Sequence, residues 1–196
     1  MSIKPEVFQR YAAERPELTT FIETGTFEGI TAIQASDYYR EVHTIELLPE
    51  YYRRAQWRIK ALGPNLKGRI TCWCGDSPEV LRNVIELLSG PAFFYLDAHY
   101  SGFGPTPEVL PLWGELQTIF ESGRKGDVIA IDDIRLCGDG QHAGWGETTL
   151  TKLVEALISI DPSYEFRLEP GFVLGDVLVA ATPLDEGTFA IGEEKI

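Results

Sequence analysis

Short apolar runs rich in β-branched and aromatic residues alternate along this chain with longer stretches of helical periodicity. The apolar runs lie at 19–25, 41–47, 69–75, 92–98 and 127–134. The helical stretches lie at 5–14, 30–39, 49–62, 78–88, 108–122 and 147–160. Such alternation is typical of a parallel sheet that is covered by helices on both faces.

The periodicity changes after Pro162. Segments 164–169 and 176–182 predict two strands joined by a short turn at 170–175, and therefore an antiparallel hairpin. With the five preceding runs, this predicts a doubly wound α/β fold with a mostly parallel seven-stranded sheet and a C-terminal antiparallel β-hairpin. A dinucleotide-binding domain would continue with parallel strands instead.

Length and composition indicate one domain, residues 1–196, because 44% apolar residues are enough to build a substantial core. A net charge of −13 argues against nucleic acid as the main partner. No apolar run approaches the ~20 residues that span a bilayer, so we expect no membrane partner. The N-terminus lacks the apolar core of a signal peptide, and three cysteines cannot all pair, so we expect a cytoplasmic protein with reduced thiols.

The first apolar run leads into a glycine-containing turn, residues 23–29 (ETGTFEG). Gly25 permits a sharp turn and Gly29 permits close approach of a ligand, although such a loop can also simply pack against a neighbouring strand. Glu23 stands at the buried end of a strand, where ionisation is costly unless a partner such as an ammonium group uses the charge. Glu46 ends the second strand, where a carboxylate can accept hydrogen bonds from both hydroxyls of a ribose or cap a helix.

These motifs resemble the cofactor motifs of class I S-adenosylmethionine-dependent methyltransferases. The resemblance spans about residues 19–134 and includes Gly75-Asp76-Ser77 at the end of the third strand. Phe27 stands where many members have a glycine, and small-molecule O-methyltransferases of the catechol type also have an aromatic residue there.

The resemblance implies a Rossmann-like fold with a cofactor half at about 19–98 and an acceptor-side half at about 99–183. It also implies that Glu46 holds the ribose, that Asp76 and Ser77 border the adenine, and that the methionine part is held by Glu23, Gly25, Thr26, Phe27 and Gly29. Residues 76–79 are equally a good helix N-terminus, and both roles can hold together.

Two further apolar runs end in acids, Asp97 after the fourth strand and Asp132 and Asp133 after the fifth. We expect these carboxylates to converge, and like charges so close repel unless a cation or proton intervenes. Oxygen ligands suit Mg²⁺ or Ca²⁺. The pattern is similar to the Mg²⁺ site of catechol-type and macrolide-sugar O-methyltransferases. Without a metal, Asp97 would orient the cofactor amine and Asp132 or Asp133 would cap a turn.

The candidate catalytic residues are Asp97, His99 and Tyr100, at the start of a loop rich in glycine and proline. A neutral His99 can accept the proton of a substrate hydroxyl. Tyr100 falls close to the position of the catalytic lysine in catechol-type relatives, so the base stays open between the two. His142, in a second long loop, is a weaker candidate.

The sequence therefore predicts SN2 transfer of a methyl group from S-adenosylmethionine to a hydroxyl of a small molecule, such as a sugar, polyketide or phenol, with Mg²⁺ assisting. The alternatives are a nicotinamide-dependent oxidoreductase and a catalytically silent methyltransferase-like binding protein. Apolar residues in segments 5–13 and 51–57 exceed what one sheet needs for its cover and favour a homodimer.

Overall fold

The computed structural model describes residues 3–99, 110–142 and 144–184. The strands are β1 (Thr20–Thr24), β2 (Glu41–Glu46), β3 (Arg69–Cys74), β4 (Ala92–Leu96), β5 (Val128–Ile131), β6 (Glu165–Glu169) and β7 (Val177–Ala181). The helices are α1 (Pro5–Glu14), α2 (Ile30–Ala35), α3 (Pro49–Leu62), α4 (Ser77–Ile85), α5 (Leu112–Glu121) and α6 (Leu150–Ile160). All the predicted strands and helices are present within the described residues, most of them shorter at their ends. The first two residues of the predicted helix 108–122 lie outside the described residues. Within the described ranges, no helix is long and apolar enough to traverse a bilayer.

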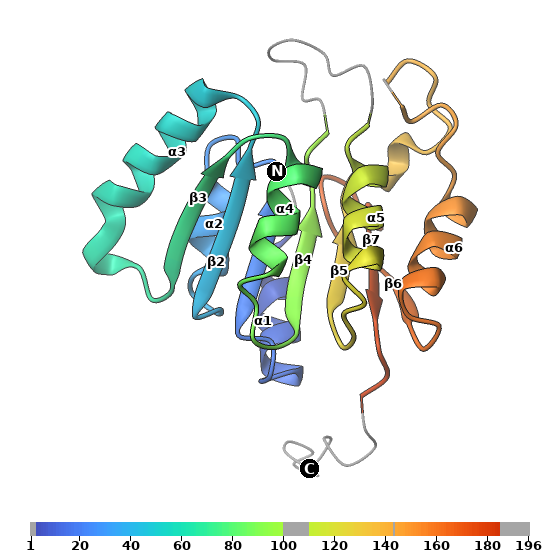
Figure 1. Cartoon of the computed structure of the whole chain (residues 1–196), viewed down its shortest axis with the longest axis horizontal. Helices are drawn as coiled ribbons and strands as arrows, with labels where there is room; N and C mark the ends of the chain where they lie inside the picture. Colours follow the sequence, from blue (N-terminus) through green and yellow to red (C-terminus); the bar gives the residue numbers. More distant parts are fainter. Residues whose placement is uncertain (1–2, 100–109, 143, 185–196) are drawn as a thin grey trace.

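The seven strands form one sheet in the order β3-β2-β1-β4-β5-β7-β6 (Figure 1). Strands β1 to β5 are parallel, and β7 is inserted antiparallel between β5 and β6. This confirms the predicted doubly wound, Rossmann-like sheet with its C-terminal hairpin. The strand order reverses between β1 and β4, and in open α/β sheets ligands bind outside the carboxyl ends of the strands at such a switch point.

Local sequence signals account for several of the element boundaries. Helices α1, α3 and α4 each carry a proline in their first turn, where a missing N–H costs nothing. Helix α6 is capped by Thr149, whose side chain accepts a hydrogen bond from the backbone N–H of Lys152 at 3.2 Å. Strand β4 is buried along its whole length, which explains why its sequence, AFFYL, is apolar without alternation.

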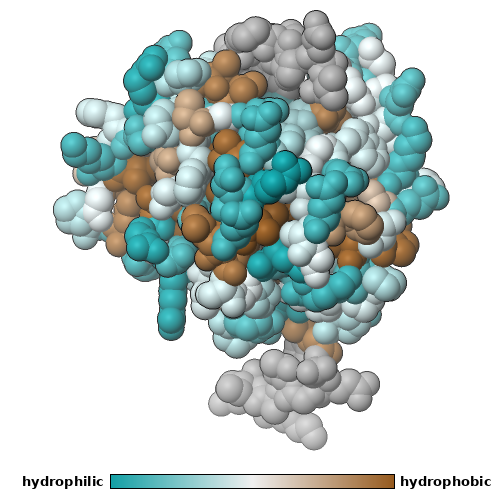
Figure 2. Space-filling model, viewed as in Figure 1, coloured by the Kyte–Doolittle hydropathy of each residue, from teal (hydrophilic) through white to brown (hydrophobic). Residues whose placement is uncertain are grey.

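Two apolar clusters fill the space between the sheet and its helices. One contains residues of α4, α5 and α6, the helices on the near side in Figure 1, and the other contains residues of α1 and α2. Helix α3 packs on β2 and β3 at one edge of the sheet. Figure 2 shows that hydrophilic side chains cover much of the near side, with apolar side chains scattered among them.

Helix α1 corrects one argument for a homodimer. Its apolar residues Val7, Phe8 and Tyr11 are buried within the chain, and Phe8 packs edge-on against Phe21 with ring centroids 5.1 Å apart. The apolar face of α1 therefore covers this chain's own sheet and is not surplus surface. Trp57 on α3 is 74% exposed, so segment 51–57 still offers apolar surface for a homodimer.

Candidate functional site

The turn between β1 and α2 is set by backbone conformation. Gly25 has φ +83°, and a Cβ at this position would lie 2.3 Å from the carbonyl oxygen of Asp97. Gly29 has φ +72° and caps α2, and Phe27 has φ +45°, which is rare for a residue other than glycine. The turn can therefore hold this shape against β4 only with glycine at position 25.

Glu46 and α3 anchor the turn from the neighbouring strand. The Glu46 carboxylate accepts hydrogen bonds from the backbone N–H groups of Phe27 and Leu48, each at 2.8 Å. The Phe27 ring lies 4.7 Å from the Tyr51 ring of α3, and Arg58 donates to the side chain of Glu28 at 2.5 Å. Glu46, at the carboxyl end of β2, therefore fixes the turn whether or not a ligand is bound.

Glu23 is buried at the end of β1. The Thr44 hydroxyl donates to its carboxylate at 2.6 Å, and the hydroxyls of Thr44 and Thr26 also lie 2.6 Å apart. Burial raises the pKa of Glu23 well above its usual value, and the charges of Asp97 and Glu46 raise it further, against the opposing effect of Thr44. Glu23 is therefore an acid whose ionised form lacks a positive partner among the described residues.

Ser77 connects the end of β3 to a residue that the sequence did not single out. Asp76 is the N-cap of α4, as the sequence predicts, and the Ser77 hydroxyl donates to the carboxylate of Glu115 on α5. Burial raises the pKa of Glu115 to about 7, against the lowering effect of hydrogen bonds from Ser77 and Thr24. A glutamate inside the apolar stretch LWGELQTIF was the available signal.

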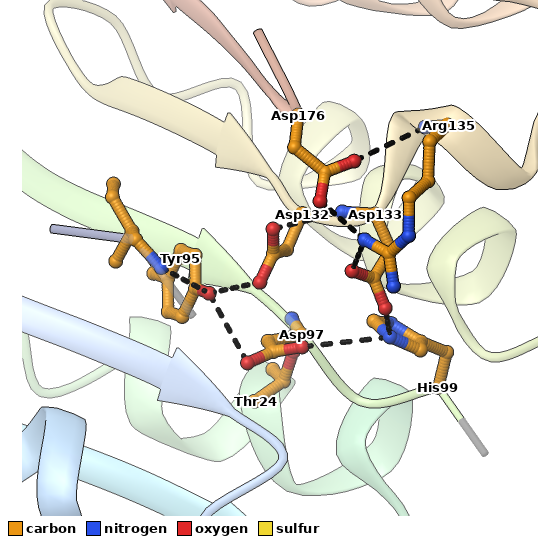
Figure 3. Close-up of polar contacts among 9 residues, drawn as sticks. Thr24, Tyr95, Asp97, His99, Asp132, Asp133, Arg135 and Asp176 are labelled. Carbon is orange, nitrogen blue, oxygen red and sulfur yellow. Dashed lines mark hydrogen bonds and ion pairs between the residues drawn. The ribbon is translucent and has the colours of Figure 1, made fainter. Parts of the chain in front are cut away.

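At the carboxyl ends of β4 and β5, a tyrosine hydroxyl joins two of the predicted acids (Figure 3). Tyr95 is fully buried, and its hydroxyl contacts Asp132 and lies 3.1 Å from Oδ2 of Asp97. The backbone N–H of Ile3 donates to the same hydroxyl at 3.2 Å. Burial and the charges of Asp97 and Asp132 raise the pKa of Tyr95 well above its usual value, so the hydroxyl keeps its proton.

The remaining acid, Asp133, lies between two cationic groups. Its carboxylate forms ion pairs with the imidazole of His99 and the guanidinium of Arg135. Arg135 also pairs with Asp176, the residue before the hairpin strand β7. Burial acts to raise the pKa of Asp133, but the hydrogen bonds and charges of His99 and Arg135 outweigh it and lower the pKa.

His99 lies inside this acidic cluster. Burial acts to lower the pKa of His99, but its hydrogen bond to Asp133 and the charges of three aspartates raise it to about 9. At neutral pH the imidazole is therefore protonated in this arrangement, whereas the predicted role as a base needs the neutral form. Its ring also packs edge-on against buried Trp145 at 5.9 Å, and both line a small cavity of about 10 Å³ with Glu115 and Asp132.

The structure thus brings together His99, Asp97, Asp132 and Asp133, and places the cofactor candidates along the neighbouring strand ends. Tyr100 lies outside the described residues, so its role stays a prediction. His142 is elsewhere and exposed, 2.9 Å from Asp139. Sequence reasoning missed Tyr95, Arg135 and Asp176.

The charges and donor atoms of this cluster fit a divalent cation. Among the described residues, two groups have ligand atoms within 4.8 Å of one another, Asp97 with His99 and Asp133, and Asp132 with Asp133 and Asp176. Four carboxyl groups face only two cationic side chains there, so negative charge is in excess even when His99 is protonated. Burial raises the pKa of Asp132, and the negative charge of Asp133 raises it further. Carboxylate oxygens suit Mg²⁺, which would remove this excess.

The comparisons with known proteins bear on the fold. No family model and no curated protein matches the sequence. The O-methyltransferase TomG from Streptomyces achromogenes, solved with S-adenosylmethionine, has a TM-score of 0.63 and 20% identity over 91% of this chain and 79% of its own. An O-methyltransferase from Bacillus cereus, solved with S-adenosylhomocysteine, has a TM-score of 0.62 and 17% identity over 92% of this chain and 82% of its own.

A third similar structure is MycE of the mycinamycin biosynthetic pathway, solved with Mg and S-adenosylhomocysteine. Its TM-score is 0.58 and its identity 14%, over 96% of this chain but only 51% of MycE. At these identities the likeness establishes the fold. This chain has the fold of class I S-adenosylmethionine-dependent methyltransferases, as its sequence motifs predict.

Proposed function

We propose that this protein is an S-adenosylmethionine-dependent methyltransferase that methylates a hydroxyl group of a small molecule. The observation that carries the proposal is the pairing of the Gly25–Gly29 turn with two acids, Glu23 and Glu46, at the carboxyl ends of adjacent strands. The switch point of the sheet lies between β1 and β4, beside this turn, and TomG and the Bacillus cereus enzyme were solved with the proposed cofactor or its demethylated product.

The cofactor end of the site, which contains Glu23, Glu46, Asp76 and Ser77, has a group for each part of S-adenosylmethionine. A buried Glu23 with no cationic partner in the described part of the chain suits the ammonium group of the methionine part, which would allow the carboxyl to ionise. Glu46 is held at the end of β2, where its oxygens can accept hydrogen bonds from ribose hydroxyls. Asp76 and Ser77, at the end of β3, are proposed to border the adenine.

At the acceptor end, Asp97, Asp132 and Asp133 are proposed to hold Mg²⁺, the metal present in the MycE structure. Bound there, the cation would polarise the acceptor hydroxyl and lower its pKa. Asp97 also lies beside the switch point, where its backbone N–H donates to Thr24 at 3.2 Å, so it would border cofactor and cation alike. His99 is proposed to accept the hydroxyl proton in its neutral form, which a cation on Asp97 and Asp133 would favour by offsetting the charges that raise the pKa of His99. Tyr100 is the second candidate for that role.

The acceptor class and the setting of the reaction rest on the sequence. A small-molecule hydroxyl suits the motifs shared with catechol-type enzymes, and TomG and MycE belong by their names to biosynthetic pathways for small molecules. We place the protein in the cytoplasm, where thiols such as its three unpaired cysteines stay reduced. A homodimer through the α3 surface around exposed Trp57 completes the proposal.

Ligand binding tests the cofactor assignment directly. S-adenosylhomocysteine should bind in a calorimetric titration and raise the melting temperature, because it binds only the folded state, whereas NAD should do neither. Absence of any S-adenosyl binding at millimolar concentration would contradict the proposed function and restore the oxidoreductase or the silent binding protein as the better reading.

Chelation tests the metal separately. Once an acceptor is found, excess EDTA should abolish methyl transfer and added Mg²⁺ should restore it, while the affinity for S-adenosylhomocysteine changes little. Full activity in excess chelator would remove the cation from the proposal and leave His99 or Tyr100 to take the proton unaided.

A further inference from the structure

The buried hydroxyl of Tyr95 joins Asp97 of one group of candidate metal ligands to Asp132 of the other, and the two groups also share Asp133. Its ring belongs to the apolar cluster under α1 and stacks near Phe21, with centroids 6.3 Å apart. Its oxygen reaches the end of the sheet and contacts Asp97 of β4 and Asp132 of β5 (Figure 3). The sequence therefore indicates a core residue at Tyr95, whereas its hydroxyl lies in a polar site.

A count of protons shows what the hydroxyl does. A tyrosine hydroxyl has one proton to donate and can accept through its oxygen. The backbone N–H of Ile3 donates to that oxygen at 3.2 Å, so the hydroxyl's own proton is directed toward the carboxylates. The neutral hydroxyl of Tyr95 therefore donates to a pair of carboxylates, those of Asp97 and Asp132. The backbone N–H of Ile3, in the segment before α1, fixes the orientation of this hydroxyl.

We infer that Tyr95 is a positioning residue whose hydroxyl, oriented by the backbone N–H of Ile3, holds the carboxylates of Asp97 and Asp132 in the arrangement that the acceptor-side cation needs. The inference rests on the proposed function, since it takes those acids as cation ligands. Hydrogen-bond partners of metal ligands orient those ligands, and their removal commonly costs 10- to 100-fold in metal affinity or activity.

The chain offers a matched control in Tyr39. Its side chain is buried in the same apolar cluster and packs on the same ring, with its centroid 5.3 Å from that of Phe21. Its hydroxyl, however, has no hydrogen-bond partner among the described residues. Tyr39→Phe and Tyr95→Phe therefore remove the same group from similar packing, and only the second removes a contact with the acids.

The experiment compares both variants with the wild-type protein, using Mn²⁺ as the probe for the cation and S-adenosylhomocysteine as the probe for the cofactor end. In Tyr95→Phe, Mn²⁺ affinity measured by electron paramagnetic resonance should fall on the order of 10- to 100-fold, and S-adenosylhomocysteine affinity should change less than about threefold. Tyr39→Phe should leave both affinities as in the wild type. A purely structural role for Tyr95 would lower the melting temperature without a selective loss of Mn²⁺.

The outcomes separate the inference from the function on which it rests. Equal Mn²⁺ affinities in the wild type and Tyr95→Phe would overturn the inference alone. Failure of the wild-type protein to bind Mn²⁺ would overturn the cation site and the inference together, whereas failure to bind S-adenosylhomocysteine would count against the proposed function. Ile3→Pro, which removes the donor N–H, should reproduce part of the Mn²⁺ loss, and Ile3→Val, which keeps it, should not.

Discussion

The two ends of the candidate site handle buried acids in opposite ways. At the cofactor end, Glu23 and Glu46 are held by neutral donors, a threonine hydroxyl and backbone N–H groups. At the acceptor end, Asp133 is held by the cationic side chains of His99 and Arg135. The first arrangement leaves room for a ligand's positive charge, and the second already contains positive charge but too little to balance four carboxyl groups.

The cofactor end and the acceptor end therefore depend on different physical properties. The cofactor end depends on backbone conformation, since glycines and a residue with positive φ aim N–H groups and acids at one place. The acceptor end depends on charge, since its side chains are arranged by attraction between carboxylates and cations. Changes in backbone conformation should therefore damage the first end most, and changes in charge the second.

The largest expected effect is at Gly25. Gly25→Ala should destabilise the protein by roughly 3 to 5 kcal/mol and abolish S-adenosylhomocysteine binding, because the added Cβ is strained by φ +83° and would overlap the Asp97 carbonyl. The control is Gly123→Ala, which also has positive φ but meets no atom within 4 Å, and should cost only about 1 kcal/mol. Equal losses in thermal unfolding would show that the turn has room to adjust.

Exchanging one acid at each end should separate their functions. Asp132→Asn removes a charge at the acceptor end and should reduce methyl transfer on the order of 100-fold, with S-adenosylhomocysteine affinity nearly intact. Glu46→Gln removes a charge at the cofactor end and should weaken S-adenosylhomocysteine binding on the order of tenfold, because one acceptor oxygen is lost. Asp97→Asn, between the two, should damage both, as kinetics and calorimetry will show.

A loss of cofactor affinity in Asp132→Asn, equal to that in Glu46→Gln, would contradict the division between the two ends. It would mean that the acids at both ends interact electrostatically across the sheet, so that a charge lost at the acceptor end also changes the affinity for S-adenosylhomocysteine.

The sequence predicted the frame of this site because parallel strands bring their carboxyl ends to one edge. Glu23, Glu46, Asp97 and Asp132 each end an apolar run, so their convergence follows from strand count and direction alone. The hairpin was equally predictable, since the alternating segment EFRLE and the apolar run VLVAA lie on either side of a short turn.

Residues that act across elements were not predictable in this way. Tyr95 reads as core in the run FFYL, and nothing local shows that its hydroxyl reaches two acids and the N–H of Ile3. Asp176 enters the site because β7 runs antiparallel, which brings its first residues, rather than its last, to the carboxyl ends of the other strands. Glu115 depends on how α5 packs against α4, a tertiary contact that periodicity does not specify.

Glu115 lies between the two ends, and its carboxyl should make stability depend on pH. Burial raises its pKa from 4.5 to about 7 in the folded protein, so the neutral form stabilises the fold fully below about pH 4.5. This contribution is lost as pH rises through 7. Relative to wild type, Glu115→Gln should therefore gain stability between pH 5 and 8, by up to about 3 kcal/mol.

Denaturant unfolding at several pH values measures this difference. The control is Glu121→Gln on the same helix, where the carboxyl is exposed and its pKa is lowered by hydrogen bonds from Gln117 and Arg82. A pH-independent difference between Glu115→Gln and wild type would show that Glu115 is ionised in the folded protein and that its hydrogen bonds outweigh burial.

The smallest effect concerns Phe27, the residue that stands where many class I methyltransferases have glycine. Phe27→Gly and Phe27→Ala both remove the ring contact with Tyr51, but only alanine keeps the strain of φ +45°. Phe27→Gly should therefore be more stable than Phe27→Ala by roughly 1 kcal/mol or less, since glycine also has the larger entropy in the unfolded chain. The same order should hold for S-adenosylhomocysteine affinity, because the backbone N–H of residue 27 must stay aimed at Glu46. If the alanine variant is the more stable, the turn relaxes to negative φ without its aromatic anchor, and the cofactor end is held by packing on α3 rather than by its backbone conformation.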